Sequence, residues 1–167
     1  MILLTIGTQL PFDRLVREMD AYAASSDEDI FGQIGKAAGY IPQNFAHCLT
    51  MNPKEFEQKF ASARVIVSHA GIGTILTARK HGKPIIVFPR QAKFGEHRND
   101  HQLATCQQLG GKAGIYPVEN ADMLRDVLSL PNLEAPAPID ESPDRAGLLN
   151  GIRHFTSGLQ RPRASIS

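Results

Sequence analysis

The feature that most constrains the fold is an alternation of short apolar runs with segments of helical periodicity. The runs 2–7 (ILLTIG), 64–70 (RVIVSHA) and 84–90 (PIIVFPR) are apolar at nearly consecutive positions. Strands that are apolar on both faces are typical of a parallel sheet with helices on each side. The chain is therefore expected to adopt an α/β fold with a doubly wound, mostly parallel, Rossmann-like sheet.

Helix signals lie between the apolar runs. Asn52 followed by Pro53 predicts an N-cap and a first-turn proline, and Gly82 is expected to end a helix over 74–82. Apolar residues also recur at helical spacing in one early segment, at Phe12, Leu15, Val16, Met19 and Ala23. The remaining predictions are strands at 29–35, 46–51 and 113–118, and helices over 101–110 and from Asn120 onward.

One domain is expected in a chain of 167 residues. It is assigned to residues 1–130, and the proline-rich segment 131–144 is predicted to be an extended linker. Residues 145–160 carry an apolar stripe typical of an amphipathic helix, which either folds back on the domain or docks on a partner. Residues 161–167 are expected to form a tail.

Composition excludes several classes of function. The 18 basic and 17 acidic residues leave a net charge of +1, which favours neither nucleic acid nor anionic membranes as partners. No apolar run approaches the roughly 20 residues that span a bilayer, and the start lacks the signature of a signal peptide. A cytoplasmic protein is therefore expected. Cys48 and Cys106 stand alone and are expected to be buried thiols.

The stretch VSHAGIGT, residues 67–74, joins a buried strand to a helix. In open parallel sheets, ligands bind beyond the carboxyl ends of the strands, where helix N-termini present free N–H groups. Gly71 and Gly73 would let a ligand approach the backbone, and Ser68 and Thr74 would offer hydroxyl groups to a phosphate. The alternative is structural, because close packing between helix and strand also selects glycine.

Two further loops support a phosphate or sugar site. Gly7-Thr8 ends the first strand, and the polar segment 95–102 could hydrogen-bond sugar hydroxyls. Two competing motifs fail. The P-loop motif is absent, because no GxxxxGK[ST] string is present. The dinucleotide-binding motif would need its glycines directly after the first strand and a third glycine at position 76, which is Leu76. NAD is therefore not expected.

Other polar residues leave alternatives open. His69 is either a hydrogen-bonded histidine at a strand end or a donor to a ligand, and Arg90 either faces phosphate or forms a surface ion pair. Four residues are possible metal ligands, because His97 and His101 would share one helical face: Glu96, His97, Asp100 and His101. Acidic residues at a helix start are also common for electrostatic reasons. No metal and no cofactor are expected.

Four motifs in order, MILLTIGTQ, SHAGIGT, GKPIIVFPR and GEHRNDHQ, resemble the C-terminal domain of glycosyltransferase family 28. The resemblance covers residues 1–130. It is greatest to single-domain members, such as bacterial exopolysaccharide subunits and the donor-binding subunit of the dolichyl-diphosphate N-acetylglucosaminyltransferase. It implies the fold of the C-terminal half of a GT-B glycosyltransferase.

The resemblance also implies a set of donor-binding residues. The glycines and Thr74 would face the donor diphosphate, and the segment from Glu96 to Gln102 would face ribose and sugar hydroxyls. His69 and Thr8 are the candidates for a catalytic role, and the general base is not assigned. The implied UDP-sugar-binding residues are Gly7, Thr8, Gln33, Ser68, His69, Gly71, Gly73, Thr74, Glu96, Asn99, Asp100 and Gln102.

The function implied by the resemblance is that of the donor-binding catalytic subunit of a two-part, UDP-sugar-dependent glycosyltransferase. Its partner would be a membrane-anchored subunit that supplies the other Rossmann half and presents a polyprenyl-diphosphate-linked acceptor. The chain would then act at the inner face of the membrane in exopolysaccharide or glycolipid synthesis. The alternative is a non-catalytic or regulatory nucleotide-binding module of the same fold.

Overall fold

The computed structural model describes residues 1–137, which form one compact unit. The predicted helix 145–160, the tail 161–167 and the second half of the predicted linker lie outside the described residues. Six parallel strands form a single sheet in the order β3-β2-β1-β4-β5-β6. The strands are β1 (Ile2–Thr5), β2 (Ile30–Gln33), β3 (Ala46–Cys48), β4 (Val65–His69), β5 (Ile85–Phe88) and β6 (Ile115–Pro117).

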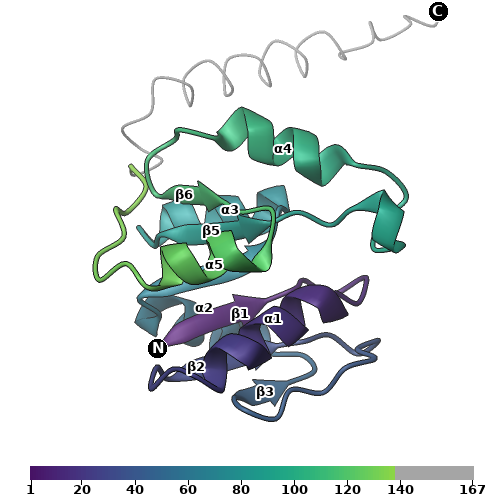
Figure 1. Ribbon diagram of the computed structural model, residues 1–167. Coiled ribbons are helices and arrows are strands. Elements are labelled where there is room, and N and C mark those ends of the chain that lie inside the picture. Colours follow the sequence, from purple (N-terminus) through teal and green to yellow (C-terminus); the bar gives the residue numbers. More distant parts are fainter. Residues whose placement is uncertain (138–167) are drawn as a thin grey trace, which may run out of the picture. The chain divides into compact units, whose positions relative to one another are not determined.

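Helices cover both faces of the sheet, as the apolar runs predict (Figure 1). The side chains of α1 and α5 pack with one set of strand residues, and those of α2, α3 and α4 pack with the other set. β1 and β5 are buried at every position. The helices are α1 (Asp13–Ala23), α2 (Pro53–Ser62), α3 (Ile72–Lys80), α4 (His101–Leu109) and α5 (Ala121–Leu128), with a 3-10 turn η1 (Ala92–Phe94).

The predicted capping signals are confirmed. The Asn52 side chain accepts a hydrogen bond from the Glu55 N–H at 2.9 Å, and Pro53 opens α2. Gly82 follows the end of α3 in the left-handed region, with φ of 58°. α3 begins earlier than predicted, at Ile72 instead of Thr74, because Gly71 is its N-cap.

Residues 131–137 pack against the domain in part. Leu133 contacts the core cluster that contains α1 and α5, Pro136 is buried beside Gly114, and the Glu134 N–H donates to the Tyr116 hydroxyl at 2.8 Å. The compact unit therefore extends beyond residue 130 to Ala137.

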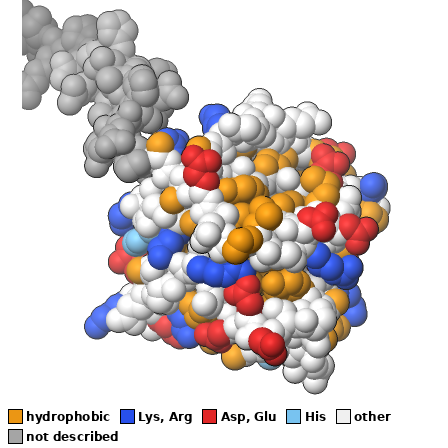
Figure 2. Space-filling view, turned by 60° about the vertical axis from the view of Figure 1, so that its left-hand side comes forward, with side chains coloured by type: hydrophobic (Ala, Val, Ile, Leu, Met, Phe, Trp, Pro, Cys, Tyr) orange, Lys and Arg blue, Asp and Glu red, His pale blue; other side chains and the backbone are white. Residues whose placement is uncertain are grey.

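The surface carries charges of both signs. On the face shown in Figure 2, basic and acidic side chains are interspersed, and hydrophobic side chains gather between them. This distribution agrees with the near-neutral composition. Within residues 1–137, no helix combines the length and apolar character that a membrane span requires.

The strand order determines where a ligand can bind. The chain runs outward from β1 to β3 on one side and returns to continue from β4 to β6 on the other, so β1 and β4 flank the switch point. Thr5 pairs with Ser68, which brings the carboxyl ends of β1 and β4 level with each other. Loops that leave a switch point diverge to opposite faces of the sheet and open a crevice.

Candidate functional site

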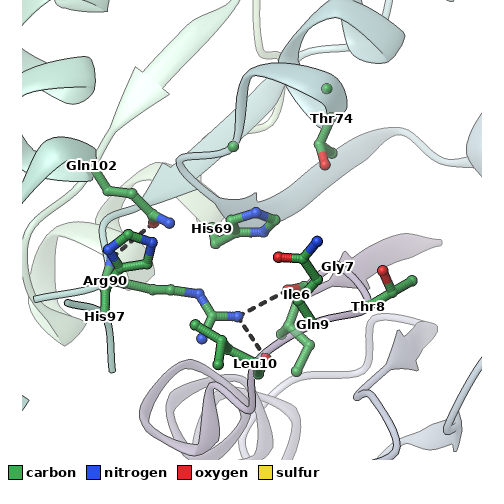
Figure 3. Close-up of a pocket in the computed structure, with 12 residues that line it drawn as sticks. Ile6, Gly7, Thr8, Gln9, Leu10, His69, Thr74, Arg90, His97 and Gln102 are labelled. Atoms are coloured by element: carbon green, nitrogen blue, oxygen red, sulfur yellow. Dashed lines mark hydrogen bonds between the residues drawn. The ribbon is translucent and has the colours of Figure 1, made fainter. Parts of the chain in front are cut away.

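A pocket lies at this switch point, beyond the carboxyl ends of β1, β4 and β5 (Figure 3). Its walls come from the loop after β1, the N-terminus of α3 and the loop between β5 and α4. The lining residues are Ile6, Gly7, Thr8, Gln9, Leu10, His69, Gly71, Gly73, Thr74, Arg90, His97 and Gln102.

The N-terminus of α3 supplies one wall. The first helical hydrogen bond runs from the Ile75 N–H to the Gly71 carbonyl, at 3.2 Å, so the N–H groups of Ile72, Gly73 and Thr74 have no partner within the helix. The first turn contains no acidic side chain. Unpaired N–H groups and the positive end of the helix dipole together form a site suited to an anion.

The two glycines of the motif have different surroundings. A Cβ atom on Gly73 would meet nothing within 4 Å, so this position borders open space. A Cβ on Gly71 would collide with the imidazole ring of His69. Gly71 therefore fits the structural alternative, close packing, whereas Gly73 leaves the helix backbone open to the pocket.

His69 forms the floor between two loops. Its ring lies between Gly71 and Gly7. A Cβ atom on Gly7 would lie 3.0 Å from the ring. Burial lowers the pKa of His69 to about 4, with a smaller contribution from the positive charge of Arg90 and from His97. The imidazole is therefore neutral at pH 7, with one nitrogen able to donate and the other able to accept.

Arg90 lines the pocket but is buried, so it does not form the surface ion pair that was one of the two expectations. Its exposed fraction is only 3%. The guanidinium donates to the carbonyl oxygens of Ile6 at 3.0 Å and Leu10 at 2.8 Å, and also to that of Pro11. Burial lowers its pKa to about 10, so the side chain stays charged at neutral pH.

Of the twelve predicted donor-binding residues, seven line the pocket: Gly7, Thr8, His69, Gly71, Gly73, Thr74 and Gln102. Figure 3 shows Gln102 and Thr74 on opposite sides of His69. The Gln102 side-chain oxygen accepts from the Arg90 backbone N–H at 3.0 Å, which fixes its orientation. The remaining five lie outside the lining.

Two of these five are buried in the sheet. Ser68 is 0% exposed, so its hydroxyl does not face the pocket. The Ser68 hydroxyl oxygen lies 3.4 Å from Nδ1 of His69. Gln33 is buried as well, and its side-chain oxygen accepts from the Thr5 hydroxyl at 2.8 Å. The placement of Ser68 and Gln33 favours a supporting role beneath the pocket over contact with a ligand.

The other three belong to the loop before α4. Glu96 forms a two-point ion pair with Arg14, at 2.7 and 2.9 Å, and also accepts from the Gln91 N–H. Asp100 accepts from the Ala92 N–H at 2.8 Å, and Asn99 accepts from the His101 N–H at 3.3 Å. Asp100 and Asn99 thus bond within their own loop, and Glu96 also connects that loop to α1.

The pocket also contains residues that the sequence pattern did not single out as donor-binding. Gln9 and Leu10 follow Gly7-Thr8, and His97 comes from the loop after β5. Nδ1 of His97 lies 3.1 Å from the Asn99 side-chain oxygen. Loop residues such as Gln9 carry no periodic signal in the sequence. Gln9 and His97 share the pocket only because the folded chain places their two loops next to each other. Within residues 1–137, no group of three or more His, Cys, Asp or Glu side chains is arranged to hold a metal ion.

Several solved structures share this fold. The glycotransferase of kitacinnamycin matches with a TM-score of 0.58 and 22% identity, over 92% of this chain and 38% of that one. MurG of Acinetobacter baumannii matches with a TM-score of 0.55 and 16% identity, over 76% and 40%. The calicheamicin glycosyltransferase CalG4 matches with a TM-score of 0.52 and 18% identity, over 75% and 32%.

The chain thus has the fold of the C-terminal half of a GT-B glycosyltransferase. The chain spans about two fifths or less of the length of these three structures. It belongs to the glycosyltransferase family 28 C-terminal domain family, whose model matches residues 1–143. No curated protein matches the sequence.

Proposed function

We propose that this chain binds the UDP-sugar donor of a two-part glycosyltransferase and provides the groups that stabilise its leaving diphosphate. The observation that carries the proposal is the open N-terminus of α3. Gly73 leaves its backbone unshielded, and Gly73 and Thr74, whose N–H groups have no partner within the helix, line the same pocket as Gly7 and Thr8.

Sugar transfer from a nucleoside diphosphate develops negative charge on the departing diphosphate. Groups that are already oriented toward that charge lower the barrier without reorganisation. The α3 N–H groups, the hydroxyls of Thr8 and Thr74, and the neutral His69 imidazole are such groups. In this proposal they take the place of a divalent metal ion, and no cofactor takes part.

The acceptor side is assigned to a partner. The described residues form one Rossmann-like unit, and the similar structures are more than twice as long as the parts that match. The pocket is small, about 280 Å³, and lies beyond the carboxyl ends of the strands, as expected for one side of a cleft. We assign the other side, the lipid-linked acceptor and the attachment to the cytoplasmic membrane face to a second, membrane-anchored subunit.

The binding part of the proposal is tested by calorimetry with UDP on two variants of one residue. In Gly73→Asp, a carboxylate at the helix N-terminus repels the diphosphate, while its interaction with the helix dipole stabilises the helix. Gly73→Asn is the matched control, with nearly the same volume and no charge. We expect UDP affinity to fall at least about tenfold further in the Asp variant than in the Asn variant, with no loss of stability.

Equal affinities in the two variants would remove α3 from the diphosphate site. The transfer part is tested separately, by mixing the chain with membranes that contain or lack the candidate partner and measuring sugar transfer from a panel of UDP-sugars to a lipid acceptor. Transfer only with the partner is expected. Transfer by the chain alone refutes the two-part scheme, and UDP binding without transfer in any mixture favours a non-catalytic module.

A further inference from the structure

Two loops frame the pocket, and arginines connect them in both directions. Arg90 directly follows Pro89, just after β5, and reaches across to the loop after β1. Its guanidinium donates to three carbonyl oxygens of that loop: those of Ile6, Leu10 and Pro11. Figure 3 shows the side chain extended beneath His69 toward Ile6 and Leu10.

Arg14 makes the reciprocal connection. It belongs to the first turn of α1, directly after the first loop, and reaches the loop that follows β5. Its guanidinium donates to the Pro89 carbonyl at 2.9 Å and pairs with both Glu96 oxygens. The same guanidinium lies 4.4 Å from the ring centre of Phe88 and 4.9 Å from that of Phe94, within the range of cation–π contacts.

We infer that Arg90 is a positioning residue, which holds Gly7, Thr8 and Gln9 at the pocket by tying their loop to the end of β5, with Arg14 as a second tie. The inference rests on the proposed function, because it assigns a purpose to a loop that would contact the donor. Arg90 itself would not bind the diphosphate, since its guanidinium is buried and already donates to three carbonyls.

The chemistry of arginine suits this role. A planar guanidinium presents five N–H donors in a fixed arrangement, whereas lysine presents a single ammonium on a flexible stem. Three carbonyls of one loop accept from the Arg90 guanidinium. A glutamine side chain has only two N–H donors, both on one nitrogen, so it could not reproduce all three contacts. The loop is then ordered before a ligand arrives, which reduces the entropy cost of binding.

The Arg90 charge also acts on the pocket floor. It lies close enough to His69 to lower that pKa, after the larger effect of burial and together with His97. Removal of the charge therefore has a spectroscopic consequence at His69 that simple loss of stability would not produce. The His69 pKa therefore reports, without UDP, whether Arg90 lies beside the pocket floor.

The test compares Arg90→Gln with Arg17→Gln, a matched control at an exposed arginine of α1 outside this pocket. In the ligand-free full chain, we expect Arg90→Gln to lower the ¹⁵N order parameters of Gly7, Thr8 and Gln9. We also expect an NMR titration to show a raised His69 pKa and calorimetry to show UDP affinity reduced about tenfold. Arg17→Gln should leave all three unchanged.

If Arg90→Gln does not fold, Arg14→Gln tests the same connection, because its side chain is 22% exposed and its loss leaves the Arg90 contacts in place. A smaller decrease in the same order parameters is expected. Unchanged order parameters of Gly7, Thr8 and Gln9 in a folded variant overturn the inference, whatever the UDP affinity. Absence of UDP binding to the wild-type chain overturns the proposed function instead, and the loop and His69 measurements still decide the role of Arg90.

Discussion

Single residues in the pocket serve packing and chemistry at once. His69 is held between two loops, and its neutral state follows from burial with support from Arg90 and His97. Gly71 and Gly73 stand two positions apart in one motif, yet the first makes room for the histidine and the second borders the pocket. Gly71 therefore has the packing role that the sequence suggested, and contact of Gly73 with a ligand stays a prediction.

The depressed pKa of His69 predicts a specific acid sensitivity. In the unfolded chain the group titrates near 6.5, whereas in the folded protein it titrates near 4. Between these values the unfolded state binds more protons, so stability decreases as the pH falls, by at most about 1.4 kcal/mol per unit. Urea unfolding at pH 7.5, 6 and 5 should show a steeper loss in wild type than in His69→Gln. Parallel curves would contradict the assignment.

The two glycines predict opposite effects of the same substitution. Gly71→Ala should destabilise the protein by about 1–3 kcal/mol, because the new methyl group collides with the buried His69 ring. Gly73→Ala should stabilise it by up to about 1 kcal/mol, because alanine is a better helix former and its Cβ enters open space. Chemical unfolding of the two variants measures both. Changes of the same sign would be inconsistent with the geometry of α3.

At the scale of elements, helices hold the loops that leave the sheet. The clearest case outside the pocket is Asp20 on α1, which is buried and accepts hydrogen bonds from the Tyr40 hydroxyl at 2.6 Å and from the N–H groups of Gln43 and Asn44. Burial raises the pKa of Asp20, but these hydrogen bonds outweigh burial and lower it overall. One carboxylate thus fixes the loop between β2 and β3 against α1.

Loss of this carboxylate should affect stability and spare binding. Asp20→Ala is expected to cost about 1–3 kcal/mol, since the donors of Tyr40, Gln43 and Asn44 lose their shared acceptor, and Tyr40→Phe about 1 kcal/mol. UDP affinity of the folded variants should remain that of the wild type, because neither residue lines the pocket. Urea unfolding and calorimetry supply the two measurements. A stability of Asp20→Ala equal to that of wild type would show that the loop is held in another way.

At the scale of the whole molecule, residues 1–137 contain both hydrophobic clusters and the entire pocket. The unit includes Leu133 and Pro136, which lie beyond the boundary at residue 130 that the change in composition suggested. Its relation to longer GT-B enzymes is that of one half, since the similar structures are covered to 40% or less.

Two truncated chains test this boundary. A chain that ends at Ala137 should unfold cooperatively and bind UDP like the full chain, because its core is intact. A chain that ends at Leu130 should be less stable, because it loses the contacts of Leu133 and Pro136 and the hydrogen bonds between Tyr116 and Glu134. Circular dichroism during heating distinguishes them. Equal melting temperatures would mean that residues 131–137 add nothing to the fold.

The class of fold, and the carboxyl-terminal edge of the sheet as the place where a ligand would bind, follow from local patterns in the chain. Apolar runs on both faces define buried parallel strands, and the residues after them meet at the carboxyl ends, so Gly7, Thr8, Gly73 and Thr74 could be grouped before their positions were known. Caps such as Asn52 are local, and local hydrogen bonds are visible as short motifs.

Which polar groups face the pocket depends instead on contacts between segments that are far apart along the chain. Arg90 contacts Ile6 across 84 positions and Arg14 contacts Glu96 across 82, and no local pattern encodes such partners. These contacts engage Glu96 and the Arg90 guanidinium in hydrogen bonds that connect the two loops, whereas Ser68 and Gln33 are buried in the sheet. The cause is that a buried polar side chain pairs with a donor or acceptor that lies near it in the folded protein, however far away that partner is along the chain.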